Sequence, residues 1–357
     1  MNTEARTIGW DVGGAHLKAA LVEYGHVVDV VQVPCTLWLG IDAIDAALAR
    51  VRARWPQARE CAHAVTMTGE MVDLFADRRV GVEALVQHLA QTLGPSVRFF
   101  TDGGWLDAPE AISAWQRVAS ANWLATAAWV AHRIDDALLV DVGSTTTDVI
   151  PIHRGSVAAR GRTDAARLES GELVYQGVVR TPLCALAQRV RFRGGESNVM
   201  NEWFATTADV YRMTNELDPA HDQHDTADHR GKDRAATCAR LARMIGRDAS
   251  DAGEADWLDL ARTFRSAQLH WIEQSVGAVL AASTLSIDAP VVAAGCGDFL
   301  ACEIADRLGR RSVDFDQLLD VAGPAARWAR VCAPSAAVAL LASSNRVAEN
   351  ARLACGS

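Results

Sequence analysis

The sequence predicts an α/β fold built from two similar lobes around a central cleft. Three observations predict it. The chain has 357 residues, and a single hydrophobic core rarely grows that large. Strand and helix patterns alternate along most of it. A strand ending in Asp-Val-Gly, followed by a turn and another strand, occurs at Asp11–Gly13 and again at Asp141–Gly143. An internal repeat about 130 residues apart indicates a duplicated architecture.

The first lobe is expected over residues 1–135 and opens with a three-stranded meander. Its strands are Thr7–Val12, Leu17–Glu23 and Val27–Val33. A helix is expected over Ile41–Arg54, because its apolar residues recur at helical spacing. The later elements are strands at 62–68 and 97–101, a helix at 82–93, and a long helix or helix pair at 109–132.

The second lobe is expected over residues 136–345, and residues 346–357 are expected to form a frayed tail. Ala137–Val142 and Thr147–Ile152 repeat the opening strands. Residues 160–260 break the regular pattern and are interpreted as an insertion or lid. The later elements are helices at 257–285, 298–308 and 334–343 and a strand at 291–294.

Composition excludes several classes of protein. The net charge is −9, and no stretch is dominated by Lys or Arg, which argues against a nucleic-acid partner. The first residues lack the apolar run of a signal peptide, and the longest apolar runs are too short to span a bilayer. The 8 cysteines form no CxxC pair, so we expect reduced thiols in a cytoplasmic protein without a zinc site. No pattern encodes the oligomeric state, which leaves a homodimer open.

The first motif with chemical potential is Asp11–Lys18. Gly13 and Gly14 follow a strand, where glycines let backbone N–H groups surround phosphate oxygens. Asp11 lies at the strand end, where a carboxylate can hold Mg²⁺. Lys18 adds a cation. The same pattern also serves ordinary hairpins, so this motif alone does not decide between the two readings.

The second motif, Asp141–Asp148, has the same shape with more hydroxyl groups. Hydroxyls and turn amides can bind phosphate without adding charge. Asp141 is a candidate metal ligand, and Asp148 is a candidate for metal binding or for orienting water. The alternative is a Thr-rich β-turn, which the pairing of two such motifs disfavours. The candidate phosphate-binding residues here are Gly143, Ser144, Thr145 and Thr146.

The third motif, Ala293–Phe299, is a strand, a glycine pair and a helix start. Gly295 and Gly297 would let a nucleoside or a phosphate approach the backbone closely. In isolation, Asp298 is better interpreted as the N-cap of the helix.

In this order and spacing, the three motifs resemble the superfamily of acetate and sugar kinases, heat-shock ATPases and actin. The resemblance covers most of the chain outside the insertion. It implies two actin-like (RNase H-like) lobes whose opposing turns, the first two motifs, grip phosphates. The third motif would then border an adenosine pocket, which makes ATP a candidate ligand.

A closer resemblance lies in longer segments. Asp141–Ile152 resembles the hydantoinase and oxoprolinase group. Four further segments resemble the archaeal methanofuran-biosynthesis synthase family and its bacterial relatives, found with tetrahydromethanopterin-linked one-carbon genes. The resemblance implies a transferase that condenses a furan-methyl diphosphate with the phenol of a γ-glutamyl-tyramine and releases diphosphate. The four segments are Thr68–Asp73, Ala119–Trp123, Gly161–Asp164 and Ser170–Pro182.

This reaction assigns roles to the acidic residues. A departing diphosphate needs its charge neutralised, which Mg²⁺ on Asp11 and Asp141 would do together with Lys18. The incoming phenol needs a base. Glu70, at the end of a buried strand, is the first candidate and Asp148 the second. Each carboxylate has the alternative role of a structural cap or paired group, and we expect the lobes to close on substrate.

The remaining substrate candidates lie near these segments. Asn122 would orient the substrate or the base. Arg162, Asp164 and Arg180 would form a substrate wall in the insertion, with a solvated charged loop as the alternative. The His- and Asp-rich run at 218–230 fits no standard zinc spacing and is interpreted as a mobile polar loop.

Two candidates lie deeper in the insertion. Asp209 is a candidate for a position on the cleft. Arg240, Arg243 and Arg247 recur at helical spacing and would face either an acidic substrate or solvent.

Three hypotheses follow. The first is the alkyl transferase, with a diphosphate and a phenolic amine as substrates. The second is an ATP-dependent enzyme, either a small-molecule kinase or a hydantoinase/oxoprolinase-like amide hydrolase. The third is a nucleotide-dependent regulator. The motifs favour the first, and a length of 357 residues weakens the amide-hydrolase reading.

Overall fold

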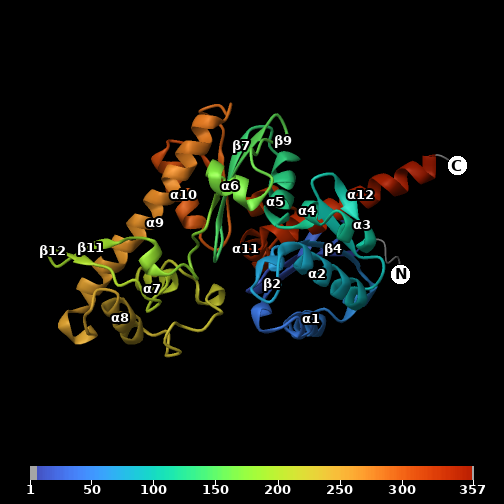
Figure 1. The fold of residues 1–357 in the computed structure, drawn as a ribbon. Coiled ribbons are helices and arrows are strands. Elements are labelled where there is room, and N and C mark those ends of the chain that lie inside the picture. Colours follow the sequence, from blue (N-terminus) through green and yellow to red (C-terminus); the bar gives the residue numbers. More distant parts are fainter. Residues whose placement is uncertain (1–5, 356–357) are drawn as a thin grey trace. The chain divides into compact units, whose positions relative to one another are not determined.

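The computed structural model describes residues 6–355, with side chains to Ser344. The chain forms two compact units (Figure 1). Unit 1 combines residues 6–135 with Ile152–Val157 and residues 314–355, and unit 2 combines Asp136–Pro151 with Ala158–Val313. The sequence placed residues 314–345 in the second lobe. They join unit 1 because the C-terminal helix packs on its sheet.

The sheet of unit 1 has the strand order β3-β2-β1-β4-β5-β6. β1 pairs antiparallel with β2 and parallel with β4, so the expected meander leads into a parallel neighbour. The predicted strands of this lobe are confirmed, and β6 is an addition. The strands are β1 (Arg6–Val12), β2 (His16–Glu23), β3 (His26–Pro34), β4 (Ala62–Met67), β5 (Arg98–Thr101) and β6 (Gly104–Leu106).

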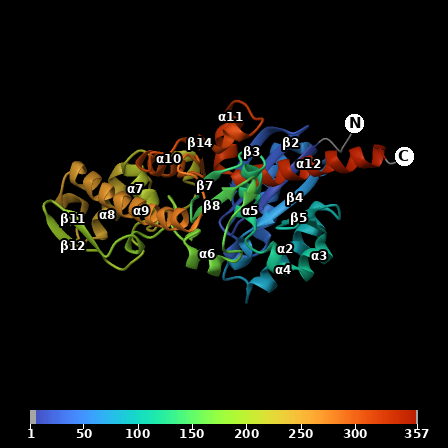
Figure 2. The same ribbon diagram turned by 90° about the horizontal axis from the view of Figure 1, so that it is seen from above.

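Helices cover both faces of this sheet. Ile8 and Trp10 of β1 are buried in one cluster with α1 (Asp42–Arg54) and α2 (Arg78–Leu93). Gly9 points to the other face, where α12 (Ala333–Cys355) lies against β1 (Figure 2). A Cβ atom on Gly9 would come within 2.1 Å of the Ser335 carbonyl oxygen, so glycine permits this close packing.

The segment expected as a long helix or helix pair at 109–132 is three short helices. They are α3 (Ala108–Ser113), α4 (Trp115–Val118) and α5 (Asn122–Ala131). The chain breaks before α5 because Ser120 has a φ of +51°, in the left-handed region that interrupts a helix. The break places a polar side chain at a defined point, which matters for the site.

The sheet of unit 2 repeats the arrangement, with the order β10-β8-β7-β13-β14. β7 and β8 correspond to β1 and β2, and β13 pairs parallel with β7 as β4 does with β1. The duplication is therefore present in the topology. β9 (Ser156–Val157) pairs with β8. The other strands are β7 (Ala137–Val142), β8 (Thr147–His153), β10 (Leu173–Val174), β13 (Val291–Ala294) and β14 (Ser312–Asp314).

The insertion is folded and packs on α9 (Glu254–Ala282), the long helix of unit 2 in Figure 1. Phe192 of the β11–β12 hairpin stacks on Trp257 with ring centroids 4.9 Å apart. The Tyr211 hydroxyl donates to Gln268 at 2.7 Å. The insertion contains α6 (Asp164–Ser170), β11 (Arg189–Phe192), β12 (Gly195–Asn198), α7 (Thr207–Met213) and α8 (Arg234–Arg243).

The remaining helices complete the two units. The predicted helix at 298–308 is confirmed as α10 (Asp298–Arg307). The expected tail at 346–357 lies outside the side chains that the structure describes. Within the described residues, no helix has the length and apolar character needed to cross a membrane. The other helices are α11 (Pro324–Val331) and the 3₁₀ turns Leu37–Leu39, Pro56–Glu60, Gly69–Met71, Leu183–Ala185, Pro219–His221, Ala249–Asp251 and Phe315–Leu318.

Candidate functional site

The first glycine motif forms the hairpin turn between β1 and β2. The Gly13 amide donates to the His16 carbonyl oxygen at 3.0 Å and closes the turn. Asp11 and Lys18 are cross-strand partners, and the Lys18 ammonium lies 3.5 Å from Asp11 Oδ2. Asp11 is buried. Unit 1 therefore places a carboxylate and an ammonium group at the base of its turn.

Glu70 is brought to the same turn by the sheet. β1 and β4 are parallel neighbours, so their C-terminal ends meet at one edge. The Thr68 amide donates to the Val12 carbonyl oxygen at 3.0 Å. A Cβ atom on Gly69 would lie 3.5 Å from the Gly13 carbonyl carbon, so the two backbones are in contact. The 3₁₀ turn that carries Glu70 is thus packed against the glycine turn.

The Glu70 carboxylate is held from the other side by the break before α5. Ser120 Oγ donates to Glu70 Oε1 at 2.8 Å, and both residues are buried. Asn122 Oδ1 accepts from the Trp123 amide at 2.8 Å. The sequence singled out Glu70 and Asn122 but gave Ser120 no role, although it lay within one of the resemblance segments. The observation that could have identified Ser120 is its place in the segment Ala119–Trp123, two residues before Asn122.

The second glycine motif forms the corresponding turn between β7 and β8. The Gly143 amide donates to the Thr146 carbonyl oxygen at 2.8 Å, the same bond as in unit 1. Ser144 Oγ and Thr145 Oγ1 lie 3.4 Å apart, and both residues are half-buried. Asp141, one strand residue before the turn, is buried. Unit 2 therefore presents neighbouring hydroxyls on a turn with a carboxylate at its base.

A segment of the insertion, residues 175–180, lies directly on this turn and is called the strap. The Val178 amide donates to the Gly143 carbonyl oxygen at 3.0 Å, and the Arg180 amide donates to that of Ser144 at 2.9 Å. A Cβ atom on Gly177 would come within 2.4 Å of the Thr145 nitrogen. The strap thus brings the backbone of Arg180 to the second turn, whereas the sequence suggested only that Arg180 forms part of a substrate wall in the insertion.

The third motif, Ala293–Phe299, is in contact with the second, Asp141–Asp148. The Gly297 amide donates to the Val142 carbonyl oxygen at 2.8 Å. Gly295 has a φ of +86°, and a Cβ atom there would lie 2.6 Å from Asp141 Oδ1. Both glycines therefore pack against the end of β7, beside the turn.

Asp148 lies in an ion-pair cluster around Arg167. Arg167 is buried and donates to Asp148 Oδ1 through Nη2, and to the Glu172 carbonyl oxygen at 3.2 Å. Asp164 Oδ1 is 3.9 Å from Arg167 Nη1. Arg162, by contrast, is exposed. A carboxylate that neutralises a buried guanidinium has a structural role, since removing it would leave a buried charge.

The interior of the insertion is a second ion-pair network. Asp209 is buried and accepts from Arg212 and from Arg240, each at 2.7 Å. Arg240 is fully buried and also donates to Asp228 at 3.0 Å. The readings of Asp209 as a cleft residue and of Arg240 as facing substrate or solvent are therefore wrong. These side chains hold the insertion together.

The same network anchors the His- and Asp-rich loop at 218–230. Arg212 donates to both oxygens of Asp222, at 2.6 and 3.0 Å, so the interpretation as a mobile polar loop is wrong. Burial alone would raise the pKa of Asp222, but Arg212 and Lys232 outweigh it and hold that pKa below its usual value. Burial and the positive charges of Arg180 and Lys232 lower the pKa of His224 to about 4.

Among the residues that the structure describes, no three His, Cys, Asp or Glu side chains gather in an arrangement that could hold a metal ion.

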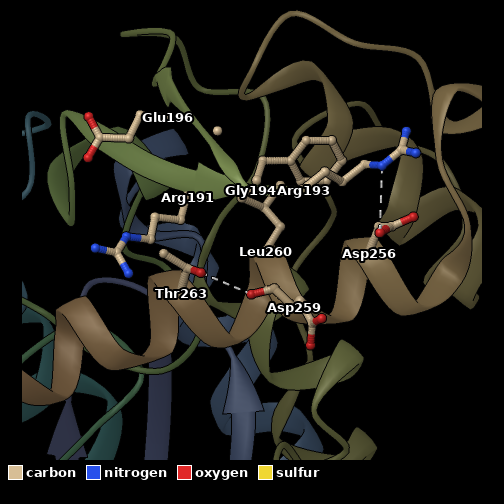
Figure 3. Close-up of a pocket in the computed structure, with 10 residues that line it drawn as sticks. Arg191, Arg193, Gly194, Glu196, Asp256, Asp259, Leu260 and Thr263 are labelled. Atoms are coloured by element: carbon tan, nitrogen blue, oxygen red, sulfur yellow. Dashed lines mark hydrogen bonds and ion pairs between the residues drawn. The ribbon is translucent and has the colours of Figure 1, made fainter.

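A separate pocket of 540 Å³ lies between the β11–β12 hairpin and α9 (Figure 3). Three of the charged side chains that line it, Arg193, Asp256 and Glu196, have ion-pair partners. Arg193 Nε lies 3.8 Å from Asp256 Oδ1, and Arg189 pairs with Glu196 at 3.3 Å. None of the three glycine motifs lines it, and we assign it no part in the chemistry.

Comparison with known proteins gives three likenesses. A family described as hydantoinase/oxoprolinase matches residues 62–333. A protein of Methanocaldococcus jannaschii, named (4-{4-[2-(gamma-L-glutamylamino)ethyl]phenoxymethyl}furan-2-yl)methanamine synthase, is 31% identical over 301 residues, which are 84% of this chain and 88% of that protein. A Methanococcus vannielii protein of the same name is 35% identical over 136 residues, which are 38% of this chain and 61% of its relative.

Among solved structures, a nucleotide-free acetone carboxylase matches with a TM-score of 0.58 at 10% identity. The match covers 93% of this chain and 70% of the carboxylase. This likeness concerns the fold, and the predicted fold class is confirmed. The breadth of the family match and the identity to the archaeal synthases place the sequence more closely. The chain belongs to the hydantoinase/oxoprolinase family, in the branch whose matched relatives are named as furanylmethanamine synthases.

Proposed function

We propose that this protein is a transferase of methanofuran-type cofactor biosynthesis. It joins a furan-methyl diphosphate to the phenol oxygen of a γ-glutamyl-tyramine-like acceptor and releases diphosphate. The observation that supports it is the strapped turn of unit 2, where the half-buried hydroxyls of Ser144 and Thr145 lie 3.4 Å apart on a turn that follows the buried carboxylate of Asp141. The printed name of the relatives adds that their product contains a phenoxymethyl-furan ether.

The proposed reaction needs no reactant beyond the furan-methyl diphosphate and the phenol. The C–O bond between the furan methylene and the diphosphate breaks, and diphosphate leaves with the bonding electrons. The phenol oxygen forms the new C–O bond. The phenol proton passes to a base, and then to diphosphate or solvent. The protein must therefore stabilise the charge on the leaving group and accept one proton.

Each turn offers one carboxylate as a candidate protein ligand for Mg²⁺. Asp11 and Asp141 are both buried at strand ends, and carboxylate oxygens are ligands that Mg²⁺ prefers. Bound Mg²⁺ would neutralise charge on the departing diphosphate. An Asp11→Asn variant should lose metal-dependent turnover while still folding. Full metal-dependent turnover in that variant contradicts the assignment.

Glu70 is the proposed base, because Asp148 is committed to Arg167. Ser120 orients the Glu70 carboxylate at 2.8 Å, and the contact of Gly69 with Gly13 fixes its backbone beside the first turn. A Glu70→Gln variant should lose about 10²- to 10⁴-fold in kcat, the usual contribution of a general base. Asp148→Asn is the matched comparison, and it should mainly lower stability.

Two measurements test the function. The first is calorimetric titration with inorganic diphosphate and with ATP, each with and without Mg²⁺. The second is a mass-spectrometric search for the ether after incubation with furan-methyl diphosphate and γ-glutamyl-tyramine. We expect diphosphate to bind, ATP to bind weakly, and the ether to form. Tight ATP binding with hydrolysis and no ether would instead indicate an ATP-dependent enzyme.

A further inference from the structure

The strap is fixed at both ends against the second turn. Before it, Val174 of β10 is paired with Thr147 of β8, and Thr147 Oγ1 donates to the Gln176 carbonyl oxygen at 2.8 Å. In its middle, the Gly177 carbonyl oxygen accepts from Gln268 at 2.9 Å and from Thr207 at 2.8 Å. The backbone of the strap is therefore as well held as a strand.

The two end residues of the strap, Tyr175 and Arg180, are exposed to solvent. The four residues between them, 176–179, are buried. Tyr175 is 60% exposed and Arg180 is also exposed. The strap therefore carries an exposed tyrosine at its start and an exposed arginine at its end, where the Arg180 amide is bonded to the Ser144 carbonyl oxygen. Holding an exposed tyrosine on such a fixed backbone reduces the entropy lost when it meets a ligand.

The surroundings of Arg180 favour an anion. Partial desolvation lowers the pKa of Arg180 and the Tyr175 side chain raises it, so the two side chains lie within electrostatic range. The positive charges of Arg180 and Lys232 both act on His224. Two carboxylates act on His224 in the opposite sense, those of Asp222 and Asp225. Arg180 itself is therefore what favours an anion, because a partly desolvated guanidinium binds a phosphate more strongly than a fully solvated one.

We propose that Tyr175 and Arg180 complete, with the turn Gly143–Thr146, a subsite for a heteroaromatic-methyl diphosphate. Arg180 binds the diphosphate oxygens, and Tyr175 packs against the heteroaromatic ring. The proposal rests on the proposed function, because it assigns the donor substrate to this half of the protein. Tyr175 and Arg180 are then substrate-positioning residues, and Tyr175 contributes specificity for an aromatic donor.

The ring and the diphosphate can be tested separately. Arg180→Gln should weaken inorganic diphosphate binding about 10- to 100-fold, as expected for loss of a charge-assisted hydrogen-bonded pair. The fold should persist, because Arg180 is tied to Ser144 through its backbone amide. Arg191→Gln is the matched control, an exposed arginine of the same insertion that should leave binding unchanged.

Tyr175→Leu should leave inorganic diphosphate binding unchanged, because the probe has no ring. It should raise KM for furan-methyl diphosphate about 3- to 10-fold, the worth of one aromatic contact. Tyr175→Phe should restore KM, because the proposed contact uses the ring and not the hydroxyl.

The outcomes separate this inference from the proposed function. Absence of ether from the unaltered protein contradicts the proposed function, while the diphosphate titrations still test Arg180. If the unaltered protein makes the ether but Arg180→Gln binds diphosphate as Arg191→Gln does, the assignment of Arg180 is overturned. An unchanged KM in Tyr175→Leu, or a Tyr175→Phe variant as impaired as Tyr175→Leu, overturns the ring contact.

Discussion

The two glycine turns are closed by the same backbone hydrogen bond, but different groups surround them. Gly13 donates to His16 at 3.0 Å, and Gly143 donates to Thr146 at 2.8 Å. The first turn is backed by the 3₁₀ turn Gly69–Met71 and carries the charged pair of Asp11 and Lys18. The second is backed by the strap and carries neighbouring hydroxyls.

This difference indicates a division of labour. Both turns have a carboxylate at the base, Asp11 in the first and Asp141 in the second. The first turn adds the ammonium group of Lys18, while the second adds hydroxyls, which supply directional hydrogen bonds without further charge. The second turn also depends on the insertion, because the strap that covers it belongs there. Damage to the insertion should therefore affect the second turn and spare the first.

The largest effect is expected from the ion-pair network inside the insertion. Arg240→Met removes a fully buried guanidinium and leaves Asp209 with one arginine partner fewer. We expect a loss of about 3–5 kcal/mol in the free energy of unfolding, as for other broken buried pairs. Urea unfolding followed by tryptophan fluorescence measures it.

The control is Arg243→Met, which removes a partner of the same Asp228. The Arg243 side chain is 37% exposed, so its loss should cost below about 1 kcal/mol. Equal losses in the two variants would show that burial of Arg240 does not govern the stability of the insertion.

The next effect concerns the contact between strap and turn. Gly177→Ala places a Cβ atom 2.4 Å from backbone atoms of Ser144 and Thr145, which cannot move aside as a side chain could. We expect the strap to shift and turnover to fall about 100-fold, the order of loss for a misplacement near 1 Å. Kinetics with saturating acceptor measure it.

Gly277→Ala in α9 is the matched control, since a Cβ atom there meets nothing within 4 Å. Alanine should stabilise that helix by up to about 1 kcal/mol and leave turnover unchanged. A Gly177→Ala variant with the kinetics of Gly277→Ala would show that strap position is unimportant for the reaction.

The sequence predicted the fold well where periodicity was strong. The meander, α9 and the repeated Asp-Val-Gly strands follow from alternating or helical spacing of apolar residues. The helix break at Ser120 was missed, because a left-handed serine has no composition signal and is imposed by its contact with Glu70. The docking of α12 on Gly9 was missed as well, since it joins residues far apart in the chain.

The sequence identified the separate motifs of the candidate site but not the contacts between them. The convergence of Gly295 on Asp141 and of Arg180 on Ser144 could not be read from spacing, because tertiary packing alone creates it. The polar loop at 218–230 was misjudged for a related reason. Its acidic residues suggest solvation until the buried partners Arg212 and Arg240 are known.

A smaller effect on stability is expected at Ser120, where two variants distinguish backbone strain from the hydrogen bond to Glu70. Ser120→Ala and Ser120→Gly both remove the bond to Glu70, which should cost about 1–2 kcal/mol. Ser120 has a φ of +51°, a conformation that glycine adopts without steric cost. The free energy of unfolding of Ser120→Gly should therefore be about 1 kcal/mol higher than that of Ser120→Ala. Thermal unfolding compares them, and equal stability would argue that the backbone is unstrained.

A local effect of pH should appear in the loop at 218–230. Hydrogen bonds from arginines outweigh burial and hold the pKa values of Asp222 and Asp228 below their usual range. Their stabilising contribution is complete above the unfolded pKa of about 3.9 and is lost as pH falls through the lower folded values. The protection factors of the loop amides, which correct for the intrinsic pH dependence of exchange, should fall below about pH 4, before those of β7. Simultaneous exchange of loop and strand would contradict a local anchor.

The smallest effect on stability is expected in the charged pair of the first turn. Lys18 and Asp11 are 3.5 Å apart, and the Lys18 side chain keeps 20% of its exposure, so Lys18→Met should change the free energy of unfolding by about 1 kcal/mol or less. If the first turn supplies charge to the reaction, the same variant should weaken Mg²⁺-dependent diphosphate binding. A large loss of stability with unchanged binding would mean that the pair fastens β1 to β2. The two turns would then differ in structural support and not in chemistry.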